Sequence, residues 1–186
     1  MVRFIFMIFI FSWGLAASSF AEESHDKFFN NLLAICGHSY IGKVVESNES
    51  DETWRKSKIV IHAPKCTTKK INEIRIPLHV GENKSRTWII SKTETGLRLK
   101  HDHRHEDGSP DDVTMYGGDT ATSGTAKTQS FPVDKYSKAL FIEQGLNVST
   151  GNTWTLSIEP NETLTYRLSR TGRLFQVSFD LQNPVE

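Results

Sequence analysis

Hydrophobic and polar residues alternate with a period of two along most of the chain. Five such segments follow one another in its first half: IGKVVES, SKIVIHA, INEIRIPLH, RTWIIS and GLRLKHDHR. Three more, TWTLSIE, TLTYRLSR and RLFQVSFDL, end the chain. This period predicts strands with one buried face. The connections are short and polar and leave no room for crossover helices, so neighbouring strands should be antiparallel.

Two segments have helical spacing instead. In SHDKFFNNLLAICG, apolar residues from Phe28 to Cys36 predict one short N-terminal helix that stops near Gly37. Between residues 106 and 153 the pattern is irregular, with a glycine pair, a strand in GTAKTQSF and a helix beginning at Asp134. That second helix, KYSKALF, should turn Tyr136, Leu140 and Phe141 inward.

The number and order of the strands predict the fold class. Eight or nine antiparallel strands joined mostly by hairpins must hide their edges, and closure into a barrel is the usual solution. We therefore expect an all-β protein, an antiparallel up-and-down barrel with a short N-terminal helix and a short helix in the middle loop. A two-sheet β-sandwich is the alternative.

The N-terminus has the pattern of a secretory signal. Residues 1–21 read MVRFIFMIFIFSWGLAASSFA, one basic residue, an apolar run and then small residues around a cleavage site after Ala21. Removal would leave a single domain of residues 22–186, secreted or periplasmic and not inserted in a membrane. Its two cysteines, Cys36 and Cys66, then predict one disulfide in an oxidising compartment.

Charge and motifs exclude several classes of function. The chain has 22 Lys and Arg against 22 Asp and Glu, with no long block of either sign, so nothing favours a nucleic-acid partner. It contains no G-x-S-x-G elbow, no Walker glycine loop and no H-E-x-x-H helix. Neither a hydrolase function nor nucleotide binding therefore has a sequence motif to support it.

The segment LRLKHDHRHE carries the main candidate chemistry. Read as a strand, it places Leu97, Leu99, His101, His103 and His105 on one face and only charged residues on the other. The charged face should meet water, so the histidines should line an open end of the barrel. Trp88 and Tyr116 are aromatic residues that would add to a ligand-binding surface there.

The same histidines suggest a metal site. Two imidazoles on alternate residues are separated by roughly 6.6 Å at Cα and can converge on one divalent transition metal such as zinc or copper. His101 and His103 would be two ligands, with His38 near the first strand as the third. The other interpretation is that these histidines are solvated residues at the rim of the barrel.

A resemblance to a known group supports the barrel. A helix leading into CGHSYIGKV, successive antiparallel strands, and Arg170 and Arg173 before FDL resemble the calycin superfamily, the lipocalin-like barrels. Where such barrels commonly open with Gly-x-Trp, this chain has GHSY. The stretch KHDHRHEDGS also resembles a group of uncharacterised exported bacterial proteins.

Three hypotheses for the function follow. The first is a secreted lipocalin-like protein that binds a small molecule or a metal at its histidine-lined end, without a covalent step. The second is a metal-dependent enzyme in which two of the histidines hold the ion. The third is a structural protein of the envelope in which the histidines have no chemical role.

Overall fold

The computed structural model describes residues 14–63 and 71–185. Helices are α1 (Gly14–Leu33), η1 (Glu49–Asp51), α2 (Glu52–Lys56), α3 (Lys135–Glu143) and η2 (Asn147–Gly151), of which η1 and η2 are 3-10 helices. The strands of the first half are β1 (Ser39–Glu46), β2 (Ile59–His62), β3 (Glu73–Val80), β4 (Asn83–Lys92) and β5 (Leu97–His103). Those of the second half are β6 (Tyr116–Asp119), β7 (Thr128–Pro132), β8 (Thr153–Glu159), β9 (Thr163–Arg170) and β10 (Arg173–Asp180).

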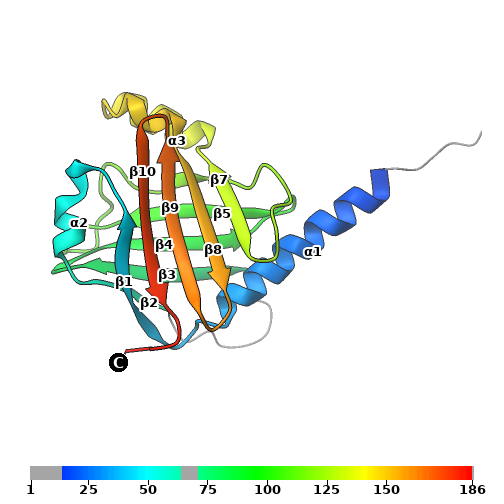
Figure 1. Cartoon of the computed structure of the whole chain (residues 1–186). Helices are drawn as coiled ribbons and strands as arrows, with labels where there is room; N and C mark the ends of the chain where they lie inside the picture. The colour runs from blue at the N-terminus through cyan, green and yellow to red at the C-terminus, as the bar shows by residue number, and fades with distance from the viewer. Residues whose placement is uncertain (1–13, 64–70, 186) are drawn as a thin grey trace, which may run out of the picture.

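All of these strands belong to one antiparallel sheet that curls into a nearly closed barrel. Their order is β6-β5-β4-β3-β2-β1-β10-β9-β8-β7, so all paired strands are consecutive in sequence except β1 and β10, and the consecutive strands β6 and β7 form the two edges. In Figure 1, β8, β9 and β10 cross in front of β3, β4 and β5 at a steep angle. The predicted all-β barrel is confirmed, with ten strands in place of eight or nine.

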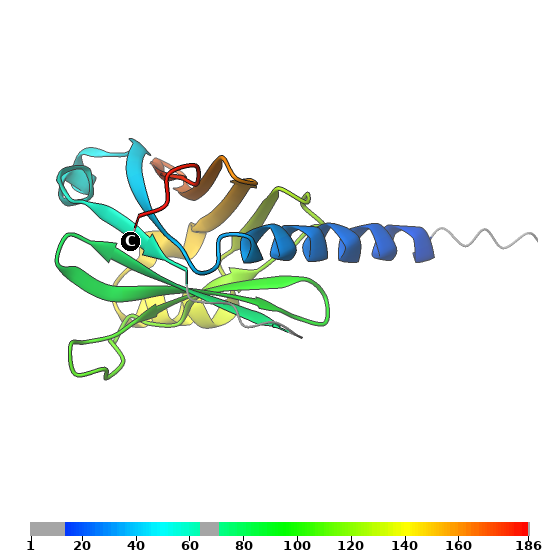
Figure 2. The ribbon, with the colours of Figure 1, turned by 90° about the horizontal axis from the view of Figure 1, so that it is seen from below.

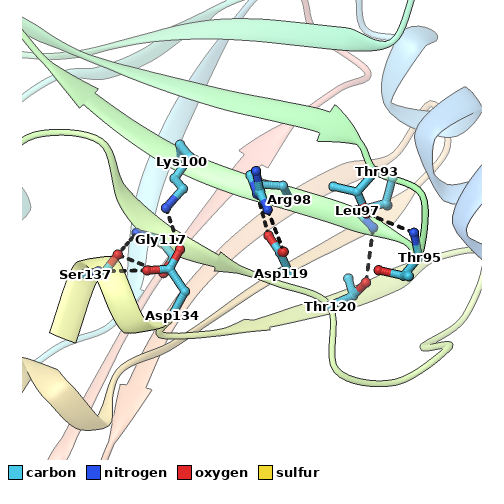
Figure 3. Close-up of polar contacts among 10 residues, drawn as sticks. All are labelled: Thr93, Thr95, Leu97, Arg98, Lys100, Gly117, Asp119, Thr120, Asp134 and Ser137. Atoms are coloured by element: carbon cyan, nitrogen blue, oxygen red, sulfur yellow. Dashed lines mark hydrogen bonds and ion pairs between the residues drawn. The ribbon is translucent and has the colours of Figure 1, made fainter. Parts of the chain in front are cut away.

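The barrel closes where β6 approaches the end of β7. The amide of Asp134 donates to the carbonyl of Gly117 at 2.9 Å, and the Ser137 hydroxyl bonds both backbone groups of Gly117. A Cβ atom at Gly118 would lie 1.8 Å from the Pro132 carbonyl oxygen, so only glycine permits this approach. Figure 3 shows this seam, with Asp134 also bound to Lys100 of β5.

The core fills the barrel according to the predicted alternation. Inward positions of β3 and β10, such as Ile76 and Val177, are almost completely buried. One end of the barrel is covered by α1, whose Phe28, Phe29 and Leu32 are fully buried. Figure 2 shows α1 running along that end and extending past the strands. No helix in the described ranges is long and apolar enough to cross a membrane.

Three local predictions need correction. The helix α1 begins at Gly14, well before the predicted segment, and so includes the predicted cleavage position. The glycine pair after Tyr116 was expected in irregular chain but forms β6, because β5 offers it a free edge. In α3, Tyr136 is exposed instead of buried, whereas Phe141 is buried as expected, together with Ser137. The predicted disulfide involves Cys66, which lies outside the described residues, so it stays a prediction.

Candidate functional site

A cavity of about 550 Å³ opens at the end of the barrel opposite α1. Antiparallel pairing brings the ends of β5 and β9 together with the starts of β4, β8 and β10 at this end. The helices η1, α2, α3 and η2 and the segment between β5 and β6 contribute further lining residues. The residues that line the cavity include Asp51, Trp54, Arg86, Trp88, His101, His103, Asp111, Tyr116, Phe141, Asn152, Trp154, Tyr166, Arg170, Arg173 and Phe175.

His101 is the histidine that lies deepest in this cavity. It follows Leu97 and Leu99 on the inward face of β5, as predicted, and is only 3 % exposed. Its Nδ1 lies 3.3 Å from the carbonyl oxygen of Tyr116, and a carbonyl only accepts, so Nδ1 carries the proton. The unprotonated Nε2 therefore accepts from the Tyr166 hydroxyl at 3.0 Å.

This hydrogen-bond chain continues to Trp154. The Trp154 side chain donates to the hydroxyl of Tyr166, which in turn donates to His101. Each polar side-chain group in this series of hydrogen bonds thus has a partner, as buried polar groups require. Burial raises the pKa of Tyr166 well above its ordinary value, so it remains a neutral donor.

His103 lies nearer to the mouth and is half-buried. Its Nε2 is 3.1 Å from the hydroxyl of Tyr116, a residue that sequence reasoning had assigned to the site. The Tyr116 ring stacks on His101 with the ring centroids 4.8 Å apart. Trp88, the pairing partner of His101 on β4, stacks on Tyr166 of β9 with the ring centroids 4.6 Å apart. The predicted residues Trp88, His101, His103 and Tyr116 therefore share one cavity.

Both imidazoles are uncharged at neutral pH. Burial lowers the pKa of His101 to about 3, since the Tyr116 carbonyl only partly offsets the lost hydration. Burial and the positive charge of Arg86 lower the pKa of His103 to about 4. Tyr116 stays protonated as well, because burial raises its pKa to about 12. The cavity wall consequently presents neutral hydrogen-bonding groups and aromatic faces.

The outer face of β5 does not meet water along its whole length, contrary to the prediction. Asp102 is buried, with its Oδ1 accepting from Arg104 Nε at 2.9 Å and from Thr114 Oγ1 at 3.3 Å. The same Thr114 Oγ1 accepts a hydrogen bond from the backbone amide of His103 at 2.7 Å. The turn after β5 folds back over this face, so Asp102 holds the segment that carries His103 in place.

The other predicted site residues lie elsewhere. His105 follows the end of β5 in an exposed turn and does not line the cavity. His38 is exposed just before β1, at the end of the barrel covered by α1. Among the residues that the structure describes, no three His, Cys, Asp or Glu side chains come close enough to hold a metal ion. The structure therefore does not bring His101, His103 and His38 together.

Three arginines of the cavity were not assigned to the site from the sequence. Arg86 precedes Trp88 by two residues, Arg170 follows Leu168 by two, and Arg173 precedes Phe175 by two. Each continues the inward alternation of its strand at the mouth end, as the histidines do in β5. The signal that could have identified them is a charged residue two positions beyond an apolar residue on the inward face of a strand.

The arrangement can hold a small molecule by stacking and hydrogen bonding. It has a concave aromatic wall, a few convergent polar groups and a volume within the range of roughly 300 to 1,000 Å³ typical of ligand pockets. We found no family model, curated protein or solved structure that matches the chain. The geometry of the cavity is therefore the basis for any functional conclusion.

Proposed function

We propose that the protein captures a small organic molecule, without covalent chemistry, in the cavity lined by His101 and His103. The observation that carries this proposal is the combination of a 550 Å³ space with neutral imidazoles on its wall. His101 has both nitrogens engaged and supports the wall. The half-buried imidazole of His103 has, among the described residues, only the Tyr116 hydroxyl as a hydrogen-bond partner, so it is the group best placed to meet a ligand.

We also propose that the chain is exported and loses residues 1–21. In support, the contacts that seat α1 on the barrel include Phe28, Phe29 and Leu32, all beyond the predicted cleavage position, whereas Phe20 is 70 % exposed. The proposed Cys36–Cys66 disulfide and a kinship with calycin barrels belong to the same hypothesis. The up-and-down order of the strands, with the first strand β1 paired to the last strand β10, supports that kinship.

The tryptophans offer a direct test of ligand capture. The chain has four, and Trp13 belongs to the proposed signal, so the three of the exported domain, Trp54, Trp88 and Trp154, all line the cavity. Intrinsic fluorescence of residues 22–186 therefore reports occupancy. Titration with naphthamide, a neutral aromatic probe, should give a saturable change, and native mass spectrometry of protein from its own host should show a bound small molecule.

A matched pair of variants locates the binding. His103→Ala should weaken the affinity for naphthamide at least about fivefold by removing a polar contact of about 1 kcal/mol. His105→Ala should bind as the wild type does, because His105 lies outside the cavity. If naphthamide gives no saturable signal and the native protein carries no small molecule, the proposed function is wrong. Equal losses in both variants would also contradict it.

A further inference from the structure

Three arginines, from β4, β9 and β10, surround the mouth of the cavity. Arg86 lies over the ring of Trp54 with its Cζ atom 5.4 Å from the centroid, and Arg173 lies over Phe175 at 5.5 Å. The Trp54 and Phe175 rings meet edge to face at 5.0 Å. Cations and aromatic rings thus alternate along one side of the opening, above the aromatic interior.

Arg173 is the one arginine of the three whose charge is neutralised by a carboxylate. Its Nη2 donates to Asp51 Oδ1 at 2.6 Å and its Nη1 contacts Asp51 Oδ2 as well. The Asp51 side chain is buried, and the pair attaches η1 and α2 to the barrel. Arg173 lowers the pKa of Asp51 against the effect of its burial, so the carboxylate stays ionised.

Arg86 and Arg170 have neutral partners instead. Arg86 donates from Nη1 to Asn83 Oδ1 at 2.8 Å, and Arg170 donates from Nη1 to Asn152 Oδ1 at 2.9 Å. Within the described part of the chain, neither guanidinium has a carboxylate oxygen within 4.0 Å. Asn152 is itself 5 % exposed, which fixes the orientation of Arg170 toward the cavity.

Asp111, the other acidic residue of the lining, does not neutralise the positive charge of Arg86 and Arg170. Asp111 directs its Oδ1 to the backbone amide of Val113 at 2.8 Å, within its own turn beside His103. The lining then carries three arginines and two aspartates, a net charge of one positive, because the histidines are neutral. Burial and the nearby charge of Arg173 lower the pKa of Arg170, in line with the absence of a carboxylate beside it in the described part of the chain.

We propose that the ligand of this cavity is an amphipathic organic carboxylate, with its apolar or aromatic body against Trp88 and Trp154 and its carboxylate at Arg170 and Arg86. This inference rests on the proposed function. A guanidinium pairs with a carboxylate through two parallel hydrogen bonds, which a neutral amide cannot reproduce. The anion would occupy the position at Arg170 that Asp51 fills beside Arg173.

Two probes of equal shape test the charge preference. Naphthoate and naphthamide differ only in the carboxylate, and tryptophan fluorescence of residues 22–186 follows both. The wild type should bind naphthoate at least about tenfold more tightly than naphthamide, and the ratio should shrink as salt screens the charges. In Arg170→Met the ratio should fall to about twofold or less, because naphthoate loses a charge-assisted pair whereas naphthamide loses at most a neutral hydrogen bond.

Two further variants provide the controls. Arg167 lies on the same strand β9 but is exposed on its outer face, bonded to Gln176, so Arg167→Met should keep the wild-type ratio. Arg170→Lys retains the charge and should keep part of the preference. If circular dichroism shows that Arg170→Met does not fold, the reduced preference is measured in Arg86→Met.

The outcomes separate this inference from the proposed function. Equal affinities for naphthoate and naphthamide, or tighter binding of naphthylmethylammonium, would overturn the carboxylate inference and leave ligand capture intact. A charge preference that persists in both arginine variants would also overturn it. Failure of every probe to saturate, with no molecule bound to the native protein, would instead reject the proposed function itself.

Discussion

Replacing His101 with glutamine removes a buried titrating group while keeping a side chain that can hydrogen-bond in the same place. Glutamine offers an N–H toward the Tyr116 carbonyl and an oxygen toward the Tyr166 hydroxyl, the two partners of the imidazole. The variant therefore tests how much of the pH dependence of stability comes from this one residue. The ligand is not needed for the measurement.

The expected magnitude follows from the pKa difference between the folded and unfolded states. His101 has a pKa of about 3 when folded and about 6.5 when unfolded. A depressed folded pKa means that the unfolded state binds more protons below pH 6.5, so stability is lost as pH falls through this window. From about pH 6.5 down to pH 5, an interval of about 1.5 pH units, the free energy of unfolding falls by about 1.36 kcal/mol per unit. The loss between pH 7 and pH 5 is therefore about 2 kcal/mol.

Urea unfolding of wild type and His101→Gln at pH 7 and pH 5 measures this contribution. The stability difference between the two proteins should move by about 2 kcal/mol in favour of the variant at pH 5. His103 titrates in both proteins, so its contribution largely cancels. Leu99→Ala, an inward neighbour on β5 with no titrating group, should show the same difference from wild type at both pH values. If the difference in the free energy of unfolding between wild type and His101→Gln is the same at pH 7 and pH 5, the reasoning is refuted.

Two further predictions concern the elements that shape the cavity. Gly118→Ala places a Cβ atom against the Pro132 carbonyl at the barrel seam and should lower the free energy of unfolding by about 1–3 kcal/mol or more. Thermal unfolding of this variant is compared with that of Gly151→Ala, where the added Cβ would meet nothing closer than 3.9 Å. Equal decreases of Tm in the two variants would contradict the role given to Gly118 in the seam. Arg173→Met removes charged hydrogen bonds to Asp51 and should cost about 2–3 kcal/mol. A double-mutant cycle with Asp51→Asn that gives no coupling energy would exclude the ion pair as the cause.

Most of the barrel could be predicted because its strands repeat every two residues. The inward positions Leu97, Leu99 and His101 were correctly placed on one face from their spacing alone. The strand β6 was missed because Tyr-Gly-Gly-Asp has no alternation and pairs only where β5 leaves an edge free. The helix α2 was missed because its sequence is polar apart from Trp54, which packs on Phe175 of a distant strand.

The candidate site could be predicted only in part. His101 and His103 were found because they continue an apolar face, whereas His105 was included on spacing without knowing that β5 ends at His103. His38 was chosen as a metal ligand without knowledge of which end of the barrel it occupies. The buried position of Asp102 depends on a turn that folds back over β5, and local pattern carries no information about such a return.

The sequence by itself determined the period of the strands, their antiparallel order and which face of β5 points inward, because these depend on neighbouring residues along one segment. Only the tertiary structure decided which strand ends share the cavity, because the pairing of β1 with β10 joins segments far apart in the chain. That closure brings Arg86, Arg170 and His103 to one opening and leaves His38 at the other. It also removes water from His101 and so makes it neutral, a property that no local sequence determines.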